Sequence, residues 1–407
     1  MKKWLIAAIG TSFLVSACLP SFQQEDEIIQ ETNPEEAESQ TVIIPNFQIS
    51  DEYYKTLLPF ETSPSRGMVV NNVHTQYDIA ELENGLMRIA QGEYPPDNYF
   101  FREGKYLNSE LITSWLEREY TEEQLQEYEM EPEENIGLNP IDNGGGSREE
   151  RARNSPIYLA HILEHNYLTK SAEDESKVRL GGVVIGLALN SVYYYRNDND
   201  PFGPTFEEPI AQEKIEEEGK KIAAEVIQRI RAMSQSEDSS EDMTELTDIP
   251  ITVALFKQEP RSSVVPGNFF AYATAAGGSN TLEDWNNVNE NHVLFPSSEA
   301  NERYREDETY FLNFKQDVES YFPNFNSVIG RGFYQGDQMS ILNIEIPVQF
   351  YGKAEIIGFT QYVAGRMIDI FPTYYNIEVS ITSVNGPEAL IIKEPDDTEP
   401  FVHIYDQ

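Results

Sequence analysis

Cysteine, basic residues and long apolar runs are all scarce in this 407-residue sequence. Its one cysteine, Cys18, excludes an internal disulfide, a Cys-x-x-Cys redox pair and a zinc site built from several cysteines. Its 29 Lys and Arg stand against 70 Asp and Glu, which gives a formal net charge of −41. Such a chain repels polyanions, so we expect no nucleic-acid partner and no broad docking on anionic lipid headgroups.

The apolar content nevertheless predicts a folded body. Hydrophobic residues make up 40% of the chain and aromatic residues 12%, which is enough for a core and excludes wholesale disorder. The only concentrated apolar run near the N-terminus covers residues 4–15, WLIAAIGTSFLV, after Lys2 and Lys3. It is shorter than the roughly 20 residues that a spanning helix needs, so we interpret it as a secretory signal.

The end of this run has the pattern of a bacterial lipobox. Val15, Ser16 and Ala17 are an aliphatic residue and two small ones, and Cys18 follows directly. We expect signal cleavage between Ala17 and Cys18 and a diacylglyceryl thioether on the Cys18 thiol. Two or three acyl chains, palmitate among them, anchor a protein stably without a spanning helix. The alternatives are an ordinary signal peptide with a chance cysteine and an uncleaved anchor.

The expected organisation has four parts. Residues 1–17 are the signal peptide, and residues 18–46 are an acidic disordered tether. Residues 47–150 form a mainly helical N-terminal section, and residues 151–407 form an α+β section. The glycines at 144–146 suggest a boundary. The last two sections either are separate or form one domain.

The expected fold class is α+β, with a mixed sheet and packed helices in the C-terminal part. Apolar spacing predicts helices in 76–94 and from Asn108 or Ser109 onward, and composition predicts a buried strand over 180–195. A helix over 207–233 and a strand over 249–259 follow, which predicts a crossover and parallel pairing. The remaining expected elements are helices at 155–168, 304–324 and 354–371 and strands at 339–352, 376–384 and 388–394.

Two segments have weak metal-site patterns. His161-Ile162-Leu163-Glu164-His165 has the H-x-x-E-H spacing, which on a helix would let both histidines share a zinc ion. We interpret it instead as a helix with histidines near its edge. The acidic loop with Asp198, Asp200, Glu207 and Glu208 lacks the spacing of a calcium loop, so a solvated turn is expected. We therefore expect no catalytic residue, no metal ligand, no cofactor and no enzymatic activity.

Several segments in order resemble the CamS family, lipoproteins described as sex-pheromone precursors of low-GC Gram-positive bacteria. The segments are YYKTLLPFETSPSRG (53–67), ENIGLNP (134–140), VVIGLALNSVYYY (183–195), GPTF (203–206), LFPSSEA (294–300), FYGKAEIIGFTQYV (350–363) and EPFVHIY (399–405). The resemblance runs from about residue 50 to the C-terminus. It implies that the released leader is trimmed and that a short apolar peptide, about Ile9 to Ala17, is secreted as a pheromone that promotes conjugative plasmid transfer.

The functional expectation is thus a lipid-anchored protein on the extracellular face of the cell membrane. Its partners would be the membrane, through lipidated Cys18, and the lipoprotein-processing enzymes. One alternative is an extracellular module that binds a small ligand or peptide, with aromatic clusters at 98–101 and 193–195 lining a groove. The other is a zinc-dependent hydrolase that uses His161 and His165.

Overall fold

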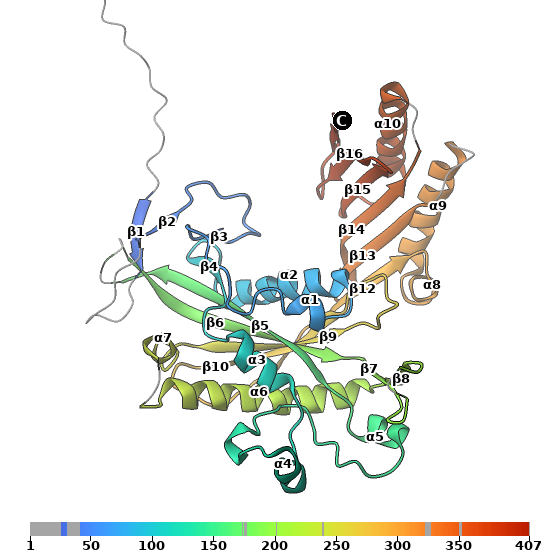
Figure 1. Ribbon diagram of the computed structural model, residues 1–407. Coiled ribbons are helices and arrows are strands. Elements are labelled where there is room, and N and C mark those ends of the chain that lie inside the picture. The colour runs from blue at the N-terminus through green and yellow to red at the C-terminus, as the bar shows by residue number, and fades with distance from the viewer. Residues whose placement is uncertain are drawn as a thin grey trace, which may run out of the picture.

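The strands of the body form two large sheets, and a computed structural model describes them (Figure 1). The described residues are 26–30, 41–172, 174, 177–200, 202–237, 240–321, 327–349 and 352–406. The first sheet has the order β11-β10-β9-β6-β5-β4-β3, with β1 and β2 attached beside β6. The second sheet has the order β12-β13-β14-β15-β16-β17. The fold class is α+β, as the sequence predicts.

The first sheet is centred on two long strands, β5 (Leu159–Lys170) and β6 (Lys177–Asn190), which pair antiparallel. The flanking strands are β1 (Asp26–Gln30), β2 (Thr41–Ile44), β3 (Lys55–Thr56), β4 (Tyr99–Glu103), β9 (Ile251–Gln258), β10 (Asn268–Ala275) and β11 (Asn286–Asn287). β6 and β9 run parallel, so the predicted parallel pairing is confirmed.

Helices cover both faces of this sheet. α2 (Gln76–Glu93) lies on one face, and α3 (Ser109–Leu116) and α6 (Gln212–Ser234) lie on the other, as Figure 1 shows. Leu82 and Leu86 of α2 enter one hydrophobic cluster and Val226 of α6 enters another. α6 approaches β6 closely at Gly219, where a Cβ atom would lie 2.6 Å from Leu189 Cδ1. Because both faces are covered, the central strands are buried almost throughout.

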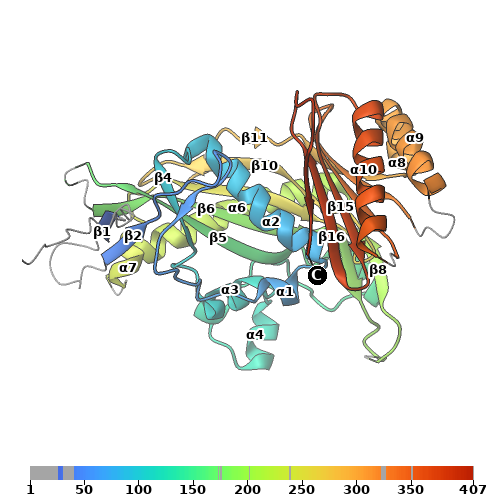
Figure 2. The same cartoon turned by 90° about the horizontal axis from the view of Figure 1, so that it is seen from above.

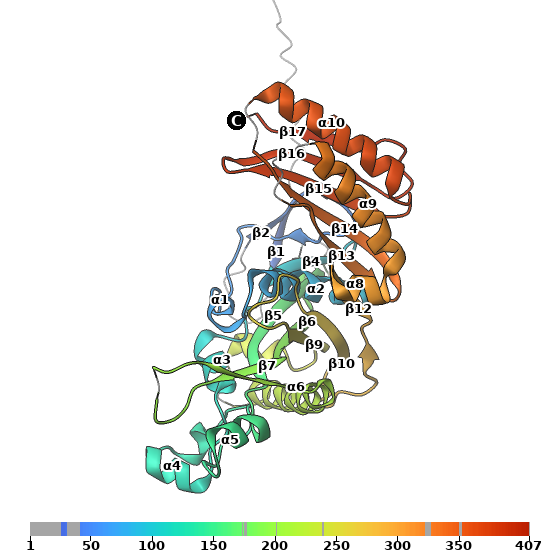
Figure 3. The same cartoon turned by 90° about the vertical axis from the view of Figure 1, so that its right-hand side faces the viewer.

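The second sheet has helices on one face only (Figures 2 and 3). Its strands are β12 (Glu290–Phe295), β13 (Ile329–Gln335), β14 (Gln338–Pro347), β15 (Asn376–Ser383), β16 (Gly386–Lys393) and β17 (Phe401–Ile404), and its helices are α8 (Ser298–Arg303), α9 (Arg305–Tyr321) and α10 (Lys353–Ile370). Phe311 and Phe359 pack from the helices into this core. Along β14, buried Ile344 and Ile346 alternate with exposed Asn343 and Glu345, as expected for a half-buried strand.

Shorter elements connect and extend the first sheet. They are α1 (Val69–Asn72), α4 (Glu122–Tyr128), a 3₁₀ turn (Pro132–Glu134), α5 (Arg148–Asn154), the hairpin β7 (Val192–Tyr195) and β8 (Phe206–Pro209), and α7 (Glu241–Thr244). No helix in the described part of the chain is both long and apolar enough to cross a bilayer. The tether expected over 18–46 contains β1 and β2, and its other residues up to position 40 lie outside the described ranges.

One predicted helix is wrong. Residues 155–168 were expected to be helical because of their apolar spacing, but they lie mostly in β5. A strand that is buried on both faces has no polar-apolar alternation, so its pattern resembles that of a helix. The expectation of a mostly helical N-terminal section is also poorly supported. Residues 99–103 are strand β4, which pairs with β5, so the first sheet continues across the glycines at 144–146.

Charged groups join the two sheets. Arg88 of α2 binds Glu81 of its own helix and Glu290 of β12, and its guanidinium lies 4.5 Å from the ring centre of Phe333. Burial raises the pKa of the Glu81 carboxyl, but His292 and Arg88 outweigh that effect and leave this pKa lowered. Arg331 of β13 in the second sheet also donates to the hydroxyl of Tyr77 of α2 at 2.9 Å, so these contacts form a joint between the two sheets. The joint is therefore largely polar.

We expect Arg88→Ala to lower the free energy of unfolding by about 3 kcal/mol, because it removes the guanidinium that pairs with both the buried Glu81 and Glu290 across the two sheets. Urea denaturation of the purified protein measures this change. The matched control is Arg303→Ala, which breaks an exposed pair with Glu299 on α8 and should cost less than about 1 kcal/mol. Equal losses in the two variants would contradict a structural role for the Arg88 cluster.

Candidate functional site

The H-x-x-E-H segment does not form a metal site. His161 and His165 lie on β5, where residues four apart are separated by about 13 Å, too far to share an ion. The described residues contain no cluster of three or more His, Cys, Asp or Glu that could hold a metal. The zinc-hydrolase alternative depended on a helix that is absent here, so it loses its geometric basis.

Each of the three residues has a structural environment instead. Glu164 is buried, and its carboxylate accepts the backbone N–H groups of Lys105 at 2.9 Å, Tyr106 at 3.1 Å and Leu107 at 2.7 Å. This interaction holds the turn that leads into α3. Burial lowers the pKa of His161 to about 4 and that of His165 to about 3, so both imidazoles are neutral at physiological pH.

The acidic loop after β7 is neutralised by arginines of α5. Arg151 Nη2 lies 2.6 Å from Asp198 Oδ2, and Arg153 Nε lies 3.0 Å from Glu208 Oε1. These carboxylates are therefore engaged and not arranged around an empty cation position. The expected solvated turn thus contributes to a charged cluster.

A broad polar cleft lies beside this cluster. It has a volume of about 320 Å³ and is lined by Arg118, Glu119, Tyr120, Gln124, Tyr128, Asp142, Gly144, Arg151 and Asp198. Arg151 Nε is 3.3 Å from Asp142 Oδ1, and the Tyr120 and Tyr128 rings meet edge to face at 5.4 Å. Arg151 is thus paired with Asp142 and Asp198, and Arg118 donates to the backbone carbonyls of Pro140 and Ser155, so both arginines of the cleft already have partners.

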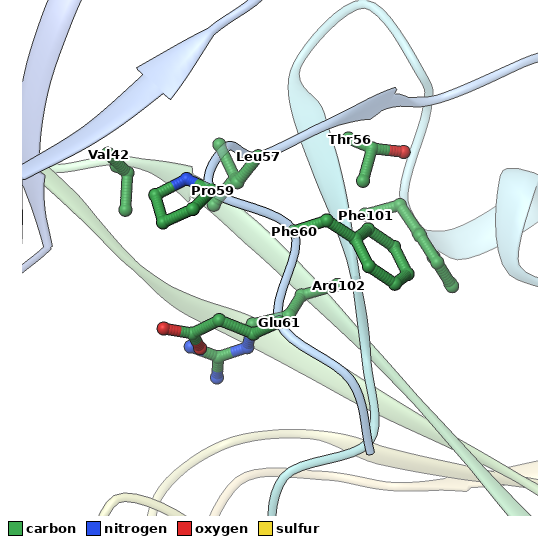
Figure 4. Close-up of a pocket in the computed structure, with 8 residues that line it drawn as sticks. All are labelled: Val42, Thr56, Leu57, Pro59, Phe60, Glu61, Phe101 and Arg102. Atoms are coloured by element: carbon green, nitrogen blue, oxygen red, sulfur yellow. The ribbon is translucent and has the colours of Figure 1, made fainter. Parts of the chain in front are cut away.

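A smaller, mainly apolar pocket lies at the edge of the first sheet, where β3 ends beside β4 (Figure 4). Its volume is only about 10 Å³, which is room for about one water molecule. Its lining is Val42, Thr56, Leu57, Pro59, Phe60, Glu61, Phe101 and Arg102. Phe101 belongs to the aromatic segment 98–101, which the ligand-binding alternative assigned to a groove. Arg102 was not singled out from the sequence, since nothing marks one arginine within YFFREG.

The tyrosines at 193–195 do not line this pocket. Tyr193 accepts a hydrogen bond from Arg148 Nη2 at 2.8 Å, and the Tyr194 ring lies 4.1 Å below the Arg261 guanidinium. Tyr195 stacks on Phe206 across the β7–β8 hairpin. Ala17 and Cys18, the expected cleavage and lipidation residues, lie outside the described residues.

The sequence model of one family matches most of this chain. Described as "CamS sex pheromone cAM373 precursor", it matches residues 60–399. The chain belongs to the CamS family. This confirms the resemblance in the sequence, and the family's description is that of a pheromone precursor and not of an enzyme.

Two solved structures of this family are similar to the chain. The C-terminal domain of the sex pheromone staph-cAM373 precursor from Staphylococcus aureus is 32% identical, with a TM-score of 0.68, over 83% of this chain and 99% of that one. The sex pheromone precursor from Lactobacillus salivarius is 28% identical, with a TM-score of 0.76, over 89% of this chain and 98% of that one. No curated protein gives a significant match. The CamS fold thus includes both sheets.

The lowered pKa of His165 gives the stability of the protein a specific pH dependence. The folded state binds a proton on this imidazole only below about pH 3, whereas the unfolded chain binds one below about 6.5. Above about pH 6.5 the imidazole is neutral in both states and does not oppose folding. As the pH falls below that value, only the unfolded state takes up the proton, so the free energy of unfolding declines. We expect His165→Leu to flatten the decline in unfolding free energy by about 1.4 kcal/mol per pH unit between pH 6 and 4.

Urea denaturation at several pH values measures this slope. His403→Leu on the exposed strand β17 is the matched control and should leave the slope unchanged. If the His165 variant keeps the full slope of the unmodified protein, the histidine is not held neutral in the folded state.

Proposed function

We propose that this CamS protein is a lipid-anchored precursor whose signal peptide yields a short secreted peptide pheromone. The observation that carries the proposal is the coincidence of two independent features in one chain. The body matches the CamS family over residues 60–399, and the leader, which lies outside that match, ends in the lipobox Val15-Ser16-Ala17-Cys18. The two related structures are described as sex pheromone precursors, which supports the same function here.

The chemistry of the leader suits both products. Cys18 carries the chain's one thiol, so it is the one side chain that can form a thioether with a diacylglyceryl group. The peptide IGTSFLVSA, residues 9–17, has no charged side chain. Such a peptide avoids the largest desolvation cost of entering a membrane, that of a charged side chain, and still diffuses in water. One cleavage would thus give an anchored body and a peptide precursor.

The proposed location is the extracellular face of the cell membrane. Acyl chains on Cys18 contribute about 0.8 kcal/mol per buried CH₂ and hold a protein without a spanning helix. The acidic body suits this position. Removing Lys2 and Lys3 with the leader takes two positive charges from a formal total of −41 and leaves −43. Its repulsion from anionic headgroups favours a body held away from the bilayer, with acyl chains as the attachment.

We expect Cys18→Ser to abolish both products together, because serine lacks the thiol on which lipidation and subsequent cleavage depend. Mass spectrometry of the membrane fraction should find acylated Cys18 at the N-terminus of the unmodified protein. The conditioned medium should contain peptides that end at Ser16 or Ala17. Neither species should come from the Cys18→Ser cells.

Ser16→Ala is the matched control, since it keeps a small residue in the lipobox and should retain both products. Finding acylated Cys18 but no leader peptide would contradict the pheromone-precursor role and leave an anchored lipoprotein. A Cys18 that carries no acyl group in the protein without substitutions would contradict the whole proposal. A response of recipient cells to the synthetic peptide of residues 9–17 then tests the signalling step.

A further inference from the structure

The second sheet ends at a strand whose outer edge is free. β17 pairs with β16 and with no other strand in the described part of the chain. The backbone N–H of Tyr405 donates to Glu388 O at 3.0 Å, which fixes the residues of β17 that turn their backbone toward β16. Because bonded and non-bonded residues alternate in an antiparallel pair, the N–H and C=O groups of Val402 and Ile404 point outward. These four groups can bond to a further strand.

This strand lacks the features that normally keep free sheet edges apart. β17 contains no Asp, Glu, Lys, Arg or Pro, although the chain has a formal net charge of −41. Its register with β16 contains no bulge. Phe401 is 62% exposed and Val402 is 41% exposed. Charges, proline and bulges are the usual means of blocking an edge, so an edge without them favours pairing with another strand.

The helix beside this edge also has an apolar exposed side. α10 lies over the end of the sheet that carries β16 and β17 (Figure 3). Ile357 and Ile368 are 38% and 41% exposed, and their spacing of about three turns places them on one side of α10. Lys353 lies within about 60° of both around the helix, and its Nζ binds Tyr405 O, so this side faces the β17 edge. The remaining charged residues of α10 lie about 100° or more from both isoleucines.

The sequence of β17 is complementary to itself. When two copies of the strand pair antiparallel about His403, Val402 of each copy lies opposite Ile404 of the other. That pair is hydrogen-bonded, because the backbone groups of both residues point outward. Phe401 then lies opposite Tyr405 in a non-hydrogen-bonded pair, where side chains approach most closely. Aromatic and β-branched cross-strand pairs of this kind stabilise a sheet.

The same pairing also covers the exposed side of α10. A two-fold axis through the paired strands places both α10 helices on one face of the joined sheet, one on each side of the axis. Val402 lies on this face, since it is opposite Ile391 of the helix-covered core. Ile357 and Ile368 of both copies therefore gather beside the paired strands. A foreign strand alone would satisfy the β17 backbone but leave these isoleucines exposed, which favours a second copy of the chain as the partner.

We propose that two copies of this chain associate through β17 and α10 and join their second sheets into one continuous sheet. The outward backbone groups of each β17 bond to those of the other, and the exposed isoleucines of both α10 helices cover the join. The net charge of each copy opposes association, so the dimer tightens as salt screens the repulsion. This interface lies in the folded body and goes beyond the proposed precursor function.

Sedimentation equilibrium of residues 18–407 with Cys18→Ser tests the proposal without acyl chains or a free thiol. This chain contains every residue that the structure describes. We expect a monomer–dimer equilibrium with dimers detectable at a protein concentration of about 100 μM. The dissociation constant should be at least threefold lower in about 0.5 M than in about 0.05 M NaCl, because the two copies repel each other less.

One pair of variants tests the strand contact. Val402→Pro removes an outward N–H and leaves the bonds to β16 intact, so it should weaken the dimer at least tenfold without lowering the unfolding temperature. His403→Pro, its matched control, removes an N–H that points toward β16 and should lower the unfolding temperature.

A second pair tests the helix contact. Ile368→Glu places a charge in the interface without touching the strand, so it should weaken the dimer at least tenfold. Leu312→Glu is the matched control, because Leu312 is similarly exposed, at 42%, but lies on α9. This control should leave the dissociation constant within about twofold.

Cysteine crosslinking of the Cys18→Ser chain tests the register. His403→Cys places the two new thiols opposite each other, with Cα atoms about 4.5 Å apart, which a disulfide can bridge. Val402→Cys places them diagonally, with Cα atoms about 7–8 Å apart, which is too far. Under mild oxidation with copper phenanthroline, only His403→Cys should give a crosslinked dimer on a non-reducing gel.

Three outcomes would overturn the proposal. The first is a chain that stays monomeric at about 100 μM in both salt concentrations, including one whose free edge binds a strand of a different protein instead. The second is a dimer that both Val402→Pro and Ile368→Glu leave intact, which would place the interface elsewhere. The third is equal crosslinking by the two cysteine variants. None of these outcomes bears on acylation or leader processing, so the failure of this proposal is distinguishable from that of the precursor function.

Discussion

The burial of β5 and β6 on both faces is the constraint on which the first sheet depends. Most of their residues are buried, so their backbone groups must be paired within the sheet. The antiparallel pairing of β5 with β6, the pairing of β4 with β5 and the parallel pairing of β6 with β9 achieve this. Their side chains must be apolar or must find partners among neighbouring elements. α2 on one face and α6 on the other are therefore required by the strands that they cover.

The polar residues on these strands show three ways of meeting that constraint. Glu164 collects backbone N–H groups and thereby orders the turn before α3. His165 gives up its charge, since burial lowers the pKa of its imidazole. Arg102, on the adjacent β4, does neither, and two of its guanidinium nitrogens lack hydrogen-bond partners. It is the place where the fold keeps an unsatisfied group beside a pocket.

Local pattern explains which parts of this fold the sequence predicts. The helix α6 and the strands β6, β9 and β14 have strong periodicity or long apolar runs, and they occur where expected. β5 lacks the alternation that marks a strand because both of its faces are buried, and its apolar spacing predicts a helix instead. The pocket is harder still to predict. Arg102 becomes notable only through the partners that its guanidinium lacks, which is a property of three-dimensional packing, and no local motif encodes it.

The joint between the two sheets has a mechanical consequence. The described residues of the C-terminal sheet and its helices form their own hydrophobic cluster, and the first sheet has separate clusters on its two faces. Each sheet thus has its own hydrophobic core, and the two are joined by the Arg88–Glu290 ion pair and the Arg331–Tyr77 hydrogen bond. Changing the angle between the sheets breaks a few charge-assisted hydrogen bonds and exposes little apolar surface. Under the lipid anchorage proposed above, such a joint would let the C-terminal sheet reorient relative to the first sheet while both hydrophobic cores stay intact.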